Sequence, residues 1–247
     1  MFYAPIPGHS GYLCRMADPS CDLSSCFLCR FCIPEWKTAL AVHKTTMAVK
    51  KGKTLFREGD PVTGIYFIYT GAVKVHKQWT EGKELILRFA KRGDILGHRG
   101  LRDKVYPVST TTLEDSRFCF ISTEFLEATL KTNPAFTYEM LYFYADELQK
   151  AENRMRNLAH MDVKGRIAEA LLQLHTFFGS DPAGTIDAKI SRQDIASYAG
   201  STYETVFKFF NELSAQGILS TEGKSLRIND PSRLRAFVTV QAPASHQ

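Results

Sequence analysis

The stretch that decides the fold runs from Ser191 to Leu213 and reads SRQDIASYAGSTYETVFKFFNEL. Ser191 can cap the first turn of a short helix, and Gly200 permits a tight turn after it. Ser201 or Thr202 can then cap a second helix, whose apolar residues recur at intervals of three and four positions. Two short helices joined by a glycine-containing turn form a helix-turn-helix.

The face of the second helix opposite its apolar residues carries polar and aromatic side chains. In a helix-turn-helix, this outward face enters the major groove of DNA. Glu204 can accept a hydrogen bond from cytosine, and Lys208 can donate one to guanine. We expect Arg192 and Gln193, at the start of the preceding helix, to contact phosphate groups. The predicted DNA-contacting residues are Arg192, Gln193, Ser201, Thr202, Tyr203, Glu204, Phe207 and Lys208.

A purely structural interpretation of this face stays open. Ser201 and Glu204 have the spacing of a capping box, in which Glu204 would bond its own helix backbone. Lys208 would then be an ordinary solvated residue. The ring of Phe207 favours an interface, because an aromatic side chain on a charged helical face needs a partner. Beyond this helix, Gly217 and Gly223 each precede a short apolar run, at 218–219 and 226–228, and these runs predict a two-stranded wing.

A long apolar seam precedes the helix-turn-helix. Its members alternate at intervals of three and four residues, as in a coiled coil: Leu141, Tyr144, Leu148, Ala151, Met155 and Leu158. A helix of about 25 residues would extend ~37 Å, too long to cover only its own domain. We therefore expect a homodimer, although an ordinary core helix could use the same residues.

The sequence pattern changes over residues 45–123, where short stretches of alternating apolar and polar residues are separated by glycines. We expect strands over 65–69, 72–76, 84–89 and 117–121. This spacing of strands and turns is typical of a small β barrel or sandwich. Ahead of it, we expect a short helix around Pro34 to His43, with the proline in the first turn.

The six cysteines are unevenly placed. Five fall within nineteen residues and the sixth stands alone: Cys14, Cys21, Cys26, Cys29, Cys32 and Cys119. Cytosolic thiols stay reduced, so the cluster predicts a metal site rather than disulfides. The spacing alone allows an iron–sulfur cluster, a structural zinc or no metal. Cys119 by itself could be a buried strand cysteine, and we take Cys14 to be a bystander.

Composition narrows the class of protein. Of 247 residues, 44% are hydrophobic and 23% charged, which is typical of globular chains. The formal net charge of +5 is only mildly basic, so charge alone would not predict DNA binding. No apolar run is long enough for a membrane helix, and the N-terminus lacks signal-peptide features. We expect a cytoplasmic protein, and without catalytic motifs we do not expect an enzyme.

With a β domain, a long helix and a helix-turn-helix in that order, the chain resembles the bacterial CRP/FNR transcription regulators (cyclic-AMP receptor protein and fumarate–nitrate reductase regulator). The resemblance covers residues 50 to about 230. Its specific stretches are Gly52 to Asp60, Gly71 to Val75, Gly93 to Gly97, Ser191 to Ile195 and Thr202 to Val206.

The resemblance implies an α+β protein with three parts. These are an N-terminal double-stranded β-roll (a cyclic-nucleotide-binding-like jelly roll), a long dimerisation helix and a C-terminal winged helix-turn-helix. We expect a Cys-rich segment at 1–44, the β-roll sensor domain at 45–133, the dimerisation helix at 134–160 and the DNA-binding domain at 161–240.

Two branches of this family differ in what they sense. The cyclic-nucleotide binders carry Gly-Glu followed by Arg-Ser, which hold ribose and phosphate. Here His98 and Arg99 follow Gly97, and the sequence from Tyr106 to Ser109 stands where the Arg-Ser pair would be. A cyclic phosphate would lack its usual partners, so we expect the chain not to bind cyclic AMP.

The oxygen-sensing branch instead holds a [4Fe-4S] cluster on cysteines. Cys26, Cys32 and Cys119 match three of its ligands, whereas the fourth should fall at position 23, which is leucine. Cys29 and Cys21 are the candidate substitutes.

The resemblance thus implies a homodimeric regulator that responds to oxygen or redox state and binds a palindromic operator in double-stranded DNA. RNA polymerase is a further expected partner. One alternative keeps the DNA-binding role and places haem, nitric oxide or a small ligand in the β-roll, with zinc or nothing on the cysteines. Another is an electron-transfer or scaffold protein.

Overall fold

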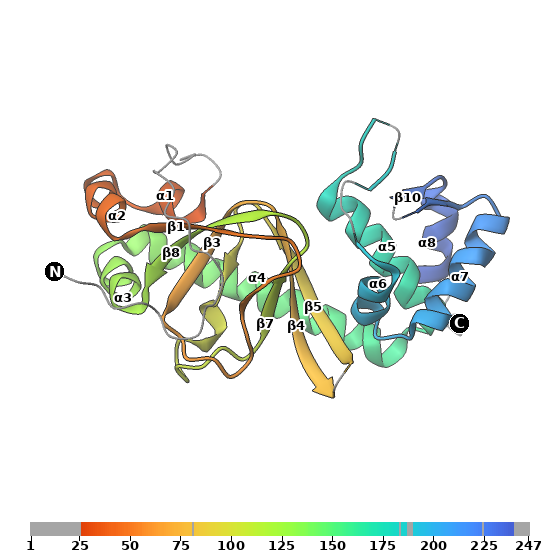
Figure 1. Ribbon diagram of the computed structural model, residues 1–247, viewed down its shortest axis with the longest axis horizontal. Coiled ribbons are helices and arrows are strands. Elements are labelled where there is room, and N and C mark those ends of the chain that lie inside the picture. The colour runs from red at the N-terminus through yellow and green to blue at the C-terminus, as the bar shows by residue number, and fades with distance from the viewer. Residues whose placement is uncertain (1–25, 81, 183, 187–189, 224, 240–247) are drawn as a thin grey trace, which may run out of the picture.

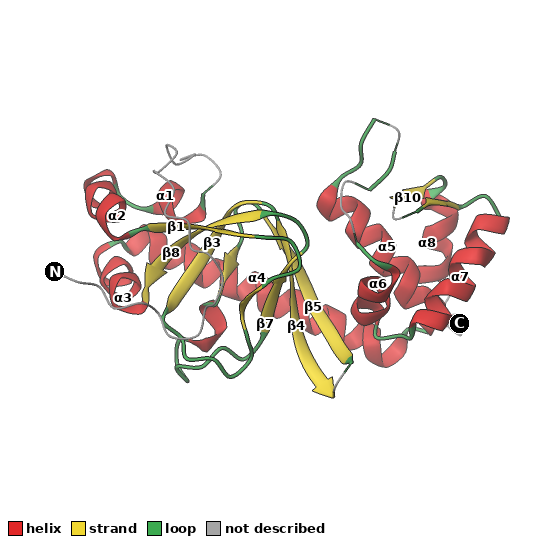
Figure 2. Cartoon of the chain, in the orientation of Figure 1, coloured by secondary structure: helices red, strands yellow, loops and turns green. Residues whose placement is uncertain are grey.

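The computed structural model describes residues 26–239, apart from 81, 183, 187–189 and 224. Two β-sheets lie at one end of the described chain and a group of helices lies at the other (Figure 1). One long helix runs alongside both parts, and a small two-stranded sheet accompanies the helical group (Figure 2). This arrangement confirms the predicted α+β fold with a β-roll, a long helix and a winged helix-turn-helix.

The N-terminal segment is helical. Helix α1 spans Phe27–Phe31, a 3-10 turn η1 spans Pro34–Trp36, and α2 spans Lys37–His43. The last two make up the short helix predicted around Pro34, with the proline in its first turn. Helix α1 was not predicted, because five residues are too few to show a period.

The β-roll consists of two four-stranded antiparallel sheets. The first has the order β1-β8-β3-β6 and the second β2-β7-β4-β5. In chain order the elements are β1 (Thr45–Val49), β2 (Thr54–Phe56), β3 (Gly64–Thr70), β4 (Ala72–Thr80), β5 (Lys83–Lys91), β6 (Ile95–Leu96), η2 (His98–Gly100), β7 (Ser109–Thr112) and β8 (Ser116–Ser122). The four predicted strands correspond to β3, β4, β5 and β8.

An apolar core fills the roll, and a glycine makes one of its turns possible. Phe67, Ile68 and Phe118 are among the fully buried side chains. Gly71, between β3 and β4, has a φ of 97°, and a Cβ atom there would lie 2.2 Å from Ser116 Oγ. Only glycine fits both the backbone conformation and the space.

Helix α3 (Thr123–Thr132) leads into the long helix α4 (Pro134–His160). Met140 is buried and Phe143 packs against the same cluster, so these two side chains face the β-roll. None of the helices in the described ranges combines the length and apolar character needed to cross a membrane.

The C-terminal part contains α5 (Val163–Phe178), α6 (Arg192–Ala199), α7 (Tyr203–Ala215), the wing strands β9 (Leu219–Glu222) and β10 (Ser225–Ile228), and α8 (Pro231–Thr239). Its core is continuous with the β-roll, because Ala72, Ile86 and Phe89 belong to the same apolar cluster as α5, α6 and α7. The two parts therefore share buried surface in this structure.

Candidate functional site

Three of the predicted cysteines lie on one short helix. Cys26 is its N-cap residue, Cys29 lies in its middle and Cys32 is its C-cap. A spacing of three residues keeps side chains on neighbouring positions of one helix face. All three are buried, with 5–7% of their surface exposed. The helix thus turns its thiols inward, as a cofactor-holding loop would.

Cys119 comes from the opposite direction, on β8. It pairs with Thr46 of β1 on one side and Phe67 of β3 on the other, and only 3% of its surface is exposed. Cys119 belongs to the same apolar cluster as the three cysteines of the N-terminal segment. The fold therefore brings together side chains that are almost a hundred positions apart in the sequence.

The Cys32 thiol lies in an environment that disfavours its charged form. Burial, and then the nearby Cys26, raises the pKa of the Cys32 thiol to about 12, against a smaller opposing effect of Lys37. Among the described residues, no three His, Cys, Asp or Glu side chains stand together in a metal-binding arrangement. Cys21 lies outside the described residues, so the ligand set stays a prediction.

The predicted DNA-contacting face lies on α7. Tyr203 and Phe207 are 42% and 41% exposed, and their rings stack with centroids 6.3 Å apart. Glu204 and Lys208 are exposed beside them. The side chain of Thr202 caps the helix by accepting from Thr205 N at 3.2 Å. Since Thr202 is the N-cap, the Ser201–Glu204 capping box is not formed.

Arg192 is engaged with the helix that follows it. Its guanidinium lies over the Phe207 ring, 5.7 Å from the centroid, and it donates to Thr221 Oγ1 in the wing at 3.4 Å. The ring of Phe207 thus already has partners in its own chain. Glu204 is fully exposed, and hydrogen bonds from its own backbone N–H and then from the Thr202 side chain lower its pKa. The carboxylate remains accessible to a ligand.

A set of polar contacts that the sequence did not reveal joins the β-roll to the helix-turn-helix. Lys74 of β4 bonds Asp194 of α6 at 2.8 Å and also contacts Glu84 of β5. Burial lowers the pKa of Lys74, but the hydrogen bonds that it donates to Asp194 and Glu84 outweigh this effect, and the pKa rises. Asp194 belongs to the capping box of α6 with Ser191, so the ion pair ends on the first turn of that helix.

Arg154 of α4 joins three elements. Its guanidinium donates to the carbonyls of Ile86 at 2.6 Å and Leu87 at 3.0 Å, and to that of Tyr198. It also lies 4.1 Å from the centroid of the Tyr198 ring. The C-terminal half of α4 is thereby fixed to β5 and α6 at once.

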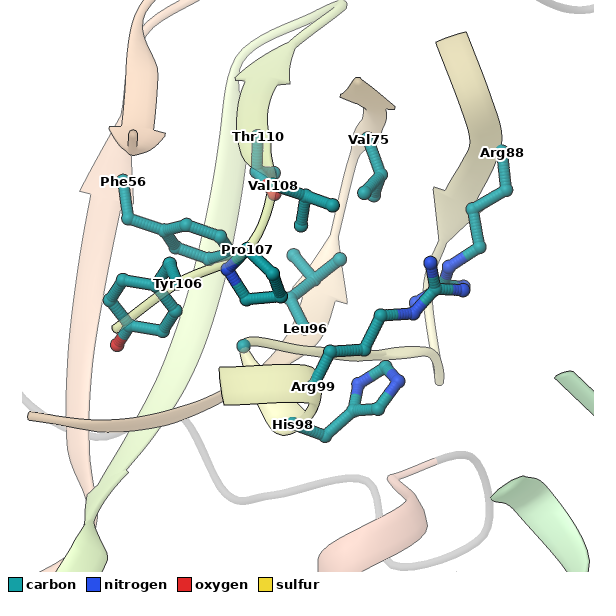
Figure 3. Close-up of a pocket in the computed structure, with 11 residues that line it drawn as sticks. Phe56, Val75, Arg88, Leu96, His98, Arg99, Tyr106, Pro107, Val108 and Thr110 are labelled. Atoms are coloured by element: carbon teal, nitrogen blue, oxygen red, sulfur yellow. The ribbon is translucent and has the colours of Figure 1, made fainter. Parts of the chain in front are cut away.

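A cavity in the β-roll lies where a small ligand could bind (Figure 3). Arg88 of β5 and Arg99 of η2 bring their guanidinium groups together beside His98. Glu147 of α4 accepts a hydrogen bond from Arg99 at 3.1 Å and forms an ion pair with Arg88, also at 3.1 Å. The open space is only about 10 Å³, close to the least that one water molecule needs. Side chains fill most of the cavity in this conformation.

Comparison with known proteins places these features in a family. Residues 46–133 match the cyclic nucleotide-binding domain, and residues 165–237 match the Crp-like helix-turn-helix domain. The CRP-like cAMP-activated global transcriptional regulator of Mycobacterium tuberculosis is 30% identical over 204 residues, covering 81% of this chain and 91% of the relative. The chain belongs to the CRP/FNR family of transcription regulators.

Two further members of the CRP/FNR family extend this comparison. The anaerobic regulatory protein of Bacillus subtilis is 28% identical over 182 residues, covering 72% of this chain and 76% of the relative. The solved structure of FixK2 from Bradyrhizobium japonicum is 26% identical with a TM-score of 0.71, covering 78% of this chain and 96% of that one. These domains and relatives are those of DNA-binding regulators and not of enzymes.

Proposed function

We propose that this CRP/FNR protein is a homodimer whose DNA binding responds to oxygen or redox state through a [4Fe-4S] cluster held by its cysteines. The observation that carries the proposal is the shared burial of Cys26, Cys29, Cys32 and Cys119 in one apolar cluster. A relative named as an anaerobic regulatory protein, similar over 72% of the chain, supports the same signal.

The donor set suits an iron–sulfur cluster in its chemistry. Thiolates are soft ligands that bind iron–sulfur clusters, and four buried cysteines are present where the N-terminal segment packs on the β-roll. Buried thiols resist ionisation unless a cation compensates the charge. Because no metal-binding arrangement exists among the described side chains, the four thiols would have to draw closer together around a shared cofactor. When bound, such a cluster would supply iron that oxygen attacks, as the resemblance to the oxygen-sensing branch implies.

The cysteine helix rests on the dimerisation helix. The ring of Phe27 in α1 meets Phe136 at 5.7 Å and Phe143 at 6.0 Å, both edge to face. Phe143 in turn meets His98, whose carbonyl accepts a hydrogen bond from Tyr144 at 2.7 Å. A change in the position of α1 would therefore reach a residue of the predicted dimer seam.

An exposed apolar stripe on α4 supports the homodimer. Leu141, Leu148 and Met155 are 61–64% exposed, and Ala151 is exposed between them. Apolar side chains repeated along one helix face are normally covered by a partner helix. Tyr144 is 37% exposed, and Leu158 is half-buried near Gly200. The seam thus runs from the cysteine end of α4 to the helix-turn-helix.

The dimer would present two α7 helices to DNA. Two-fold symmetry would set them about 34 Å apart, one turn of the duplex, and require a palindromic operator. Each α7 would offer Glu204 and Lys208 to bases, with Gln193 near the backbone phosphates. RNA polymerase is the partner through which such a dimer would act on transcription.

Purification without air tests the proposal. We expect a brown protein containing iron and acid-labile sulfide that loses its colour and its operator affinity together on exposure to air. Cys119→Ser should lose the iron, whereas Cys14→Ser, which changes the predicted bystander, should retain it. An air-exposed protein that bleaches but binds DNA at constant salt as tightly as before would contradict the proposal.

A second candidate function is ligand sensing in the β-roll. The observation that favours it is the convergence of Arg88 and Arg99 in the cavity, in a domain whose family binds cyclic nucleotides. Against it, Glu147 already pairs with both arginines, and little open space remains. Titration with cyclic AMP, together with metal analysis, separates the two: heat of binding in a metal-free or zinc-containing protein would favour this candidate.

A further inference from the structure

The buried side chain of Asn133 joins three parts of the chain where α3 ends and α4 begins. Its Oδ1 accepts a hydrogen bond from the backbone N–H of Ile33, at 3.0 Å and across 100 positions of sequence. Its Nδ2 donates to the Thr129 carbonyl at 3.1 Å. No part of Asn133 is exposed to solvent. One side chain thus ties the residue after Cys32 to both helices.

This bond occupies the atom that would otherwise cap α4. Asn133 is the N-cap residue of α4, with Pro134 as the first helical residue. An asparagine in this position ordinarily turns its Oδ1 toward the N–H of the second or third helical residue. Here no side-chain cap bond is made. The start of α4 lacks its cap because the oxygen is bonded to Ile33.

A neighbouring contact holds the same segment against α3. Trp36 Nε1 donates to Thr129 Oγ1 at 3.0 Å, and the indole stacks on Phe125 with ring centroids 5.7 Å apart. Thr129 is fully buried and itself bonds the Phe125 carbonyl at 2.7 Å. The segment that follows the cysteines is therefore attached to α3 and, through Asn133, to the α3–α4 junction.

We propose that Asn133 is the positioning residue through which the cysteine segment sets the start of the dimerisation helix. With the segment docked, Oδ1 binds Ile33; with the segment withdrawn, the side chain turns and Oδ1 caps α4. A side chain holds one rotamer at a time, so the two bonds are alternatives, and the junction has two states. The cause of withdrawal rests on the proposed function, whereas the exchange of bonds does not.

The test removes the donor of this hydrogen bond, the Ile33 N–H, rather than its acceptor, the Asn133 side chain. A change at Asn133 itself would leave buried polar groups unsatisfied, and the variant could fail to fold. Ile33→Pro deletes the N–H that Asn133 accepts and leaves Asn133 itself unchanged. Ile33 has φ −59° and ψ 148°, which suits proline. Cys32 has φ −74° and ψ 141°, which suits the residue before proline. Ile33→Val, which keeps the N–H, is the matched control.

Amide hydrogen exchange in the full-length protein, purified without air, gives the main readout. We expect the amides of Ala135 and Phe136 to exchange about tenfold more slowly in Ile33→Pro than in Ile33→Val, because they gain the cap. Loss of a merely structural tie would loosen the junction and speed exchange. Unchanged or faster exchange in Ile33→Pro therefore overturns the proposal.

Sedimentation and iron analysis of the same samples address the link to sensing. We expect Ile33→Pro to retain iron yet dimerise as weakly as the air-treated wild-type protein, while Ile33→Val follows the untreated protein. A dimer of undiminished strength in iron-loaded Ile33→Pro would contradict the positioning role. If the wild-type protein holds no iron, the proposed function fails, and the amide measurement still decides whether the two bonds exchange.

Discussion

The two ends of α4 are held in different ways. At the N-terminal end, the cysteine segment is attached through uncharged groups, chiefly the Asn133 side chain and the edge-to-face rings of Phe27 and Phe136. At the C-terminal end, Arg154 is bonded to three carbonyls, and the Lys74–Asp194 ion pair lies nearby. The first attachment depends on one short segment staying in place, whereas the second is distributed over several elements. We infer that the signal enters at the N-terminal end and that the C-terminal end keeps the DNA-binding helices in register.

The largest expected effect comes from the middle of α4, which both ends share. Leu148→Glu places a charge on the exposed seam, so we expect it to abolish dimerisation without unfolding the chain, because 61% of Leu148 is exposed in the protomer. Sedimentation measures the mass. Gln149→Glu adds the same charge at an adjacent exposed position and should remain dimeric. A dimeric Leu148→Glu protein would reject the seam.

Arg154→Met tests the C-terminal end. It leaves the carbonyls of Ile86, Leu87 and Tyr198 without their charged donor, and we expect the free energy of unfolding to fall by about 2–4 kcal/mol. Urea denaturation measures it. Arg156→Met is the matched control on the same helix, since Arg156 is exposed and its guanidinium donates to the side chain of the adjacent Asn157. Equal stability of the two variants would show that the C-terminal end is no more firmly held than exposed surface.

Glu204→Ala tests the predicted DNA-contacting face of α7, which follows the C-terminal end of α4 in the chain. We expect it to relax base preference at one operator position by about 1–3 kcal/mol. Titration of single-base operator variants at constant salt measures the preference. Thr202 supplies the cap of α7, so the helix should persist, as circular dichroism can verify. An equal loss of affinity for every operator variant would assign Glu204 a structural role instead.

The ion pairs near the C-terminal end predict a smaller, pH-dependent effect. Hydrogen bonds from His76 and then Lys74 lower the pKa of Glu84 from 4.5 to about 2. A carboxyl group with a depressed pKa stabilises the fold above its unfolded pKa, and that contribution is lost as pH falls through the folded value. Between pH 4.5 and 2 we expect the wild-type protein to lose about 1–2 kcal/mol more than Glu84→Gln, since solvent screens part of the interaction.

Chemical denaturation across this pH range provides the check on Glu84. Glu127→Gln, on an exposed position of α3, serves as the control and should retain the wild-type pH dependence. Identical pH profiles for the wild-type protein and Glu84→Gln would remove Glu84 from the contacts that support the C-terminal end.

The sequence predicted the elements whose residues repeat locally. The seam on α4, the alternation in β3, and the caps and turn of the helix-turn-helix each depend on residues that are only a few positions apart in the sequence. Contacts between distant positions were not predictable in this way, because no local pattern pairs Lys74 with Asp194 or Ile33 with Asn133. A partial signal existed for Asp194, since Ser191 and Asp194 have the spacing of a capping box.

The cysteines show the same difference between local patterns and contacts across the chain. Their spacing indicated that Cys26, Cys29 and Cys32 act together, but only the resemblance to a family connected them with Cys119. The pairing of β8 with β1 and β3 is what carries Cys119 to the cysteine helix. Strand order in a β-roll depends on packing across the whole domain, so spacing alone could not supply it.

In the proposed function, the cysteine cluster controls the dimer and, through it, DNA binding. The most direct measurement follows the dimer dissociation constant of the wild-type protein by sedimentation, without air and then after exposure to air, with iron measured in each sample. We expect loss of iron and weakening of the dimer to proceed together, and Cys119→Ser to begin in the weakened state. Iron lost with no change in the dimer dissociation constant would contradict the proposed function.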